Sequence, residues 1–220
     1  MTSENSSNIN SKTHGGDKVA MWMLLVVVLV SAALFFWTSS RYQQGDATVD
    51  THVDAEGHLH VLGVTLGLTT LDQAETVLKS KSDVALYIYP QGHPKEGLKL
   101  EAFFPAIADH TKVVLLLDLT EKQLLEIESR ATVPHLYPNM VARMNLAADD
   151  VGAVHTATVR ELTLIPNLNV SLEILKARFG EPNKIERLDE DRNQYLYDAV
   201  GLKAILSEKE PPELQFSNPK

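Results

Sequence analysis

Lys112-Val-Val-Leu-Leu-Leu-Asp-Leu119 carries five consecutive apolar side chains, which would point to both sides of an extended chain. A strand that is apolar on both faces is typical of the interior of a sheet, where it is covered on each side. We therefore expect 112–119 to be a central strand.

The segments around this strand predict alternating helices and strands. The spacing of a capping box, in which two side chains satisfy free backbone groups at a helix start, occurs twice. The two pairs are Thr70 with Gln73 and Thr120 with Gln123. They predict helices over 71–80 and 121–131. The expected strands are 84–89, 98–104, 158–165, 185–188, 194–197, 202–206 and, at an edge, 214–216. A helix is expected from the cap Asn169 to Gly180, and a short one over 139–146.

The order of these elements recurs about a hundred residues later. A helix, the strand Tyr87-Ile-Tyr89 and Gly97-Leu-Lys-Leu100 are matched by a helix, Tyr195-Leu-Tyr197 and Gly201-Leu-Lys-Ala204. Such an order predicts a duplicated unit with different loop lengths. The predicted fold class is α+β, with one N-terminal transmembrane helix followed by two related units of helix and antiparallel sheet.

The repeated unit resembles the SmpA/OmlA family. The resemblance rests on Leu172–Leu206, above all Phe179-Gly-Glu-Pro182, and on Leu66-Gly-Leu-Thr69 in the first half. It implies helices packed on a small antiparallel sheet, and tandem copies resemble the beta-lactamase inhibitor protein fold, whose concave sheet grips other proteins. The chain departs from the family in lacking a lipoprotein cysteine and in reading Lys79-Ser-Lys-Ser-Asp83 where the first unit would end its helix.

The segment Val19–Trp37 holds 19 residues without a charged side chain. As a helix it would span roughly 28 Å, which matches a hydrocarbon core. It is longer than the apolar region of a cleaved signal peptide, the alternative interpretation, and ends in Phe-Phe-Trp rather than in small residues. Lys12 and Lys18 precede it, so we expect a single-pass signal-anchor in a bacterial inner membrane, with the N-terminus cytoplasmic and the domain periplasmic.

The expected organisation follows from this segment and the repeat. It is a disordered cytoplasmic tail (1–18), a transmembrane helix (19–37), a linker (38–56), a first repeat (57–133), a connector (134–157) and a second repeat (158–217).

Composition excludes several classes of function. A net charge of -9 without a basic cluster disfavours nucleic acid as a partner, and the absence of cysteine from the sequence excludes disulfides and thiolate chemistry. No nucleophile motif or phosphate-binding loop is present, so no catalytic residue and no cofactor is expected. The acidic runs Asp149-Asp150 and Asp189-Glu190-Asp191 are interpreted as solvated turns rather than as paired catalytic carboxylates.

Two sets of residues are candidate sites. On an extended segment His58 and His60 would point to the same side and could share zinc or copper, with Asp54 or Glu56 as a third ligand. Exposed tyrosines on strands favour protein contact, which makes protein-binding candidates of Tyr87, Tyr89, Tyr195 and Tyr197.

We expect a membrane-anchored, non-catalytic protein-binding or scaffolding module of the bacterial cell envelope, with a metal-binding sensor or enzyme centred on His58 and His60 as the alternative. A structural subunit of a larger membrane complex is the third possibility.

Overall fold

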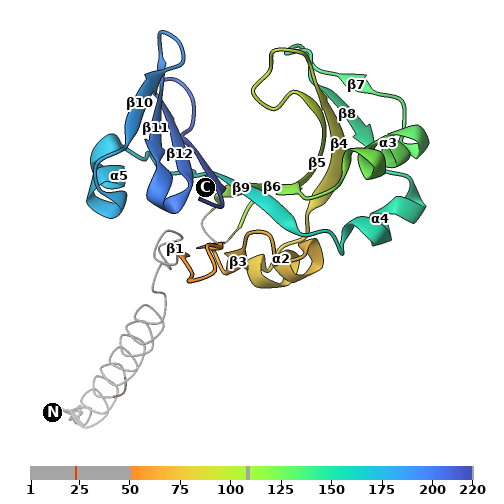
Figure 1. The fold of residues 1–220 in the computed structure, drawn as a ribbon, viewed down its shortest axis with the longest axis horizontal. Coiled ribbons are helices and arrows are strands. Elements are labelled where there is room, and N and C mark those ends of the chain that lie inside the picture. The colour runs from red at the N-terminus through yellow and green to blue at the C-terminus, as the bar shows by residue number, and fades with distance from the viewer. Residues whose placement is uncertain (1–22, 24–50, 108–109, 220) are drawn as a thin grey trace, which may run out of the picture. The chain divides into compact units, whose positions relative to one another are not determined.

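The computed structural model describes Met23, residues 51–107 and residues 110–219. From residue 51 onward these belong to one compact unit. Most of this unit is β-structure, with one ten-stranded antiparallel sheet, a second sheet of three strands and four α-helices among the described residues (Figure 1).

The ten-stranded sheet contains the central strand that the sequence predicts. Its order is β10-β11-β12-β13-β9-β6-β5-β4-β8-β7, so β6 lies in the interior between β9 and β5. The strands are β4 (Asp83–Tyr89), β5 (Gly97–Phe104), β6 (Lys112–Leu117), β7 (His135–Leu136), β8 (Ala142–Asn145), β9 (Val159–Ile165), β10 (Lys184–Arg187), β11 (Arg192–Tyr197), β12 (Leu202–Ser207) and β13 (Glu213–Ser217).

Strand β9 joins the two halves of the chain into this one sheet. Leu162 of β9 pairs with Leu115 of β6 on one side and with Phe216 of β13 on the other. The segment 214–216 is therefore an interior strand rather than the expected edge. Leu214 and Phe216 are both 1% exposed. Such complete burial is typical of a strand inside a sheet, where neighbouring strands on both sides help to cover its side chains.

The smaller sheet and the helices lie against the outside of this structure. The three-stranded sheet consists of β1 (His52–Val53), β2 (Leu59–Val61) and β3 (Val64–Thr65). The helices are α2 (Leu71–Leu78), α3 (Glu121–Arg130), α4 (Ala148–Val154) and α5 (Leu172–Phe179), with a short 3-10 helix η1 (Asp198–Val200). Both predicted capping boxes are confirmed, at the starts of α2 and α3. Helix α5 is capped by Ser171, whose hydroxyl accepts from the Ile174 amide, and not by Asn169 as expected.

The helix predicted over 139–146 is wrong. The Asn139 side chain accepts a hydrogen bond from the Val141 amide, and Met140 has a φ of 65°, a left-handed conformation that interrupts a helix. Ala142 and Met144 are then both buried, with the two-residue period of a strand, and β8 pairs with β4.

The predicted transmembrane helix is also corrected. The longest helix of the described residues is α3, with 10 residues, and it measures roughly 15 Å, about half of a hydrocarbon core. Within residues 51–107 and 110–219 no helix is long and apolar enough to cross a membrane. The described residues are mainly β and contain no transmembrane element, which corrects the predicted fold class and, with it, the predicted single-pass signal-anchor and inner-membrane location. Apart from Met23, the tail, the predicted span 19–37 and residues 38–50 lie outside the described residues.

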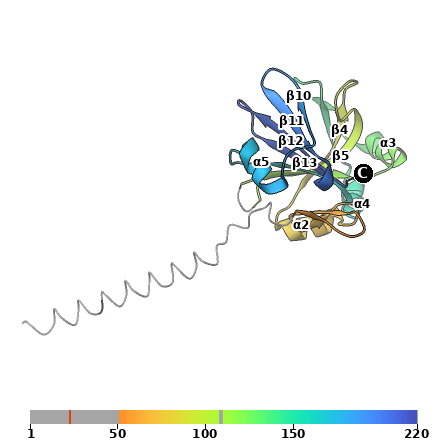
Figure 2. The same ribbon diagram turned by 60° about the vertical axis from the view of Figure 1, so that its left-hand side comes forward.

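The core lies between the outer face of the large sheet and the helices. On the sheet side, Leu100, Phe104 and Leu115 are fully buried. On the opposite side the core includes Leu71, the first residue of α2, and Leu66, which precedes the helix. Figures 1 and 2 show the sheet bending upward from β6 and β9 into two arms, one of β10–β12 and one of β4, β5 and β8, with α3 and α5 outside the arms. The helices therefore pack on the outer face of the sheet, and its inner face, between the two arms, has no helix of the described residues packed on it.

Candidate functional site

The inner side of the bent sheet is a surface that no helix of the described residues covers (Figure 1). We call it the open face. Its side chains alternate along each strand with the buried core residues, so register defines it. It includes Tyr87, Tyr89, Lys99, Glu101, Phe103, Val114, Leu116, Thr163, Leu196, Lys203 and Gln215. Of these, Phe103, Val114, Leu116 and Leu196 are half-buried apolar side chains.

A buried carboxylate fixes one tyrosine of this face. Glu101 is only 5% exposed. It accepts a hydrogen bond from the Tyr89 hydroxyl and another from Lys95 Nζ, each 3.0 Å long. Burial raises the pKa of the Tyr89 phenol, with the Glu101 charge adding to the effect, so Tyr89 stays a neutral donor. The ring is held in place rather than free to rotate.

A second tyrosine stands beside the first. The Tyr87 and Tyr89 rings are stacked with centroids 6.2 Å apart, and the His93 ring stacks on Tyr89 with centroids 4.7 Å apart. Burial raises the pKa of Tyr87, which lies near Arg143 of β8. That guanidinium is in turn held by both carboxylate oxygens of Asp83, at 3.0 and 2.9 Å. The structure thus gathers Tyr87 and Tyr89 into one ordered aromatic cluster.

The other two predicted tyrosines do not join this cluster. Tyr195 pairs with Ala204 and Tyr197 with Leu202, so both point to the outer face. Tyr197 is 2% exposed and packs on Phe179 of α5, with ring centroids 5.8 Å apart. In the first half, Tyr87 is opposite Lys99, whereas in the second half Leu196 is opposite Lys203. The matched motifs are therefore offset by one residue, which places the two tyrosine pairs on opposite faces.

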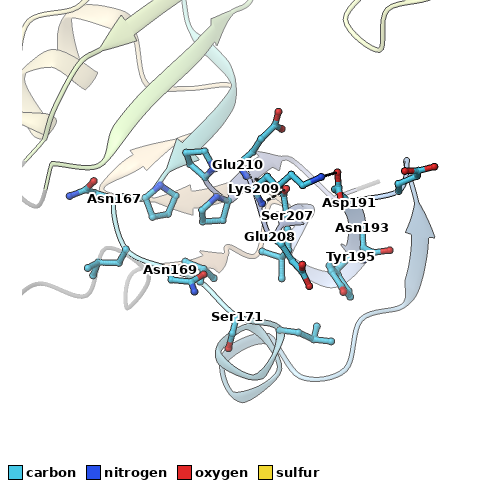
Figure 3. Close-up of a pocket in the computed structure, with 18 residues that line it drawn as sticks. Asn167, Asn169, Ser171, Asp191, Asn193, Tyr195, Ser207, Glu208, Lys209 and Glu210 are labelled. Carbon is cyan, nitrogen blue, oxygen red and sulfur yellow. Dashed lines mark hydrogen bonds and ion pairs between the residues drawn. The ribbon is translucent and has the colours of Figure 1, made fainter.

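Tyr195 instead lines a pocket of about 760 Å³ on the outer face of the β10–β12 arm. The pocket lies between the loop from β9 to α5 and the loop from β12 to β13. Figure 3 shows Asn169 and Ser171 on one side of it and Tyr195, Ser207 and Glu208 on the other. Sequence reasoning missed this site, because its walls come from three separated segments. The available signals were Pro166, directly after a predicted strand, and the pair Pro211-Pro212, which follows the acidic loop Glu208-Lys209-Glu210.

The histidine cluster forms, but its groups bond to one another. His60 Nε2 lies 3.0 Å from Asp54 Oδ2, and His60 Nδ1 lies 3.0 Å from Thr65 Oγ1. His58 Nδ1 is 3.5 Å from the same Asp54 oxygen, and His52 stacks on His60. The hydrogen bond with His60 is the main cause that lowers the pKa of Asp54 to about 2. Within the described residues, no group of three or more His, Cys, Asp or Glu is arranged to hold a metal ion.

The acidic runs are tied to cations rather than to each other. Asp150 lies in the first turn of α4 and binds Arg130 of α3 through both carboxylate oxygens, at 3.1 and 2.7 Å. Asp191 binds Lys209 at 2.6 Å, and the hydrogen bond from Arg192 lowers the pKa of Asp189. These contacts fasten α3 to α4 and the β10–β11 loop to the β12–β13 loop.

Comparison with models of protein families, with curated proteins and with solved structures found no match. The SmpA/OmlA resemblance therefore stays a prediction.

Proposed function

We propose that this chain is a non-catalytic protein-binding module that contacts a partner protein through its open face. The observation that carries the proposal is the stacked pair of Tyr87 and Tyr89, with Tyr89 held by Glu101, on a sheet surface that no described helix covers (Figure 1). Aromatic side chains are enriched at the centre of protein interfaces. A tyrosine that is already ordered loses little conformational entropy on binding.

The rest of the open face fits the same role. Half-buried apolar residues such as Val114 and Leu116 of β6 belong to the same face and would lose their remaining exposure under a partner that spans it. Lys99 and Lys203 lie on the two arms and supply positive charges, which act on association rate and selectivity. The resemblance to a fold that grips proteins with a concave sheet supports the proposal by analogy only.

Charge reversal on this face should strongly reduce partner recovery. We expect Lys99→Glu, and independently Lys203→Glu, to reduce the amount of partner isolated with the full-length chain by roughly tenfold, because like charges would meet across a matched interface. The measurement is affinity isolation from cells that produce the protein, quantified by mass spectrometry. Thermal unfolding of each variant checks that the fold is retained.

The matched control is Lys122→Glu, which reverses the same kind of charge on α3, where the lysine side chain is 86% exposed. Proteins recovered with the wild type and Lys122→Glu, but lost with both open-face variants, support the proposal. Equal recovery with all three variants would refute it, and so would a loss caused by Lys122→Glu.

A further inference from the structure

The pocket of about 760 Å³ exists because α5 covers only part of its arm. Tyr197 and Leu202 are buried beside α5, whereas Tyr195 and Leu206 lie farther along the same strands and line the pocket. An eight-residue helix is about 12 Å long, shorter than the hairpin of β11 and β12 with its loop. The uncovered ends of the strands become the pocket floor.

The pocket presents apolar surface to solvent. Leu168 lines it and is 63% exposed, although a leucine gains free energy when it is removed from water. Tyr195, Leu206 and three prolines complete this surface: Pro166, Pro211 and Pro212. A ligand for this pocket therefore needs an apolar part.

The charged side chains around this apolar surface indicate what the rest of the ligand should be. Four carboxylates line the pocket (Glu190, Asp191, Glu208 and Glu210) against a single lysine, Lys209. Lys209 is bound to Asp191 at 2.6 Å, and Glu210 lies 3.8 Å from Arg192. Among the described residues, Glu190 and Glu208 have no cation within salt-bridge distance. The unmatched charge is negative and therefore favours a cationic ligand.

We propose that this pocket binds an arginine-containing segment of another protein, with flanking apolar side chains against Leu168 and Tyr195 and the guanidinium among the carboxylates. Arginine fits both surfaces, because its aliphatic stem packs on apolar groups while its planar head donates to carboxylates. The site lies on the outer face, apart from the open face, and its occupation does not depend on the function proposed above.

Titration with a short peptide tests the assignment on the full-length chain. The probe is acetyl-Leu-Arg-Leu-amide, and its control is the same peptide with citrulline, which keeps the shape of arginine and removes the charge. Exposed ion pairs contribute about 0.2–1 kcal/mol each, so we expect the citrulline peptide to bind roughly tenfold more weakly. The double variant Glu190→Gln, Glu208→Gln should weaken the arginine peptide by the same factor.

Two further variants separate the pocket from general attraction to an acidic protein. Glu56→Gln with Glu121→Gln makes the same change in net charge at exposed positions outside the pocket and should leave the affinity unchanged. Leu168→Ser should weaken binding by about fivefold with little effect on stability, because the side chain is already largely in water. Equal affinity for the two peptides, equal loss in the control variant, or equally tight binding of spermidine would overturn the proposal.

Discussion

Gly201→Ala should lower the free energy of unfolding by more than about 4 kcal/mol, a loss that few single substitutions reach. Gly201 ends η1 with a φ of 53°, and its carbonyl accepts a hydrogen bond from the Ser217 amide. A Cβ at this position would lie 1.8 Å from the Ser217 carbonyl oxygen, which is backbone and cannot turn away. The alanine must therefore push the end of β13 out of the sheet. Urea unfolding of the full-length chain measures the loss.

Gly92→Ala is the matched control for this substitution. Gly92 also has a positive φ, of 83°, but a Cβ there meets nothing within 4 Å. It should cost only the strain of the left-handed conformation, about 1–2 kcal/mol. A loss for Gly201→Ala no larger than that for Gly92→Ala would show that β13 does not lie against Gly201.

Glu75→Ala should cost roughly 2–4 kcal/mol at neutral pH, because it leaves the half-buried amide and hydroxyl of Ser82 without their acceptor and removes the partner of Lys81. The Glu75 carboxylate is 4% exposed and accepts hydrogen bonds from Lys81 Nζ at 2.6 Å, the Ser82 amide at 3.0 Å and the Ser82 hydroxyl at 2.8 Å. It fastens the end of α2 to the segment that enters β4. Lys81→Ala removes only the partner that is 83% exposed and should cost about 1 kcal/mol or less.

The same carboxylate makes stability depend on pH in a defined direction. Burial would raise the pKa of Glu75, but the hydrogen bonds from Lys81 and Ser82 outweigh burial and lower it below the ordinary 4.5. A lowered pKa in the folded state adds stability above the unfolded pKa and loses it as the pH falls. The difference between wild type and Glu75→Ala should thus shrink below about pH 4.5. A difference that grows on acidification would contradict this assignment.

Local signals in the sequence predicted local structure well. The capping boxes at Thr70 and Thr120 placed two helix starts, because both partners lie within four residues of each other. The apolar run after Lys112 placed the interior strand β6. In contrast, the helix predicted over 139–146 is wrong, because the strand in this segment depends on pairing with β4, more than fifty residues away.

Features that depend on register or on distant segments could not be predicted. The motifs around Tyr87 and Tyr195 look equivalent, but a shift of one residue in pairing sends the two tyrosine pairs to opposite faces. The Glu101–Tyr89 contact depends on the hairpin of β4 and β5, and the pocket beside Tyr195 needs three loops to meet. Nothing in a linear pattern specifies that β9 lies between β6 and β13.

Site-specific photo-crosslinking tests the open face most directly. A photoreactive phenylalanine derivative placed at Lys99, opposite Tyr87, should crosslink the partner protein in cells. The same group at Leu125, 49% exposed on α3, should not. Crosslinks to one protein from position 99 alone are the predicted result. Crosslinks to that protein from position 125 and none from position 99 would contradict the account.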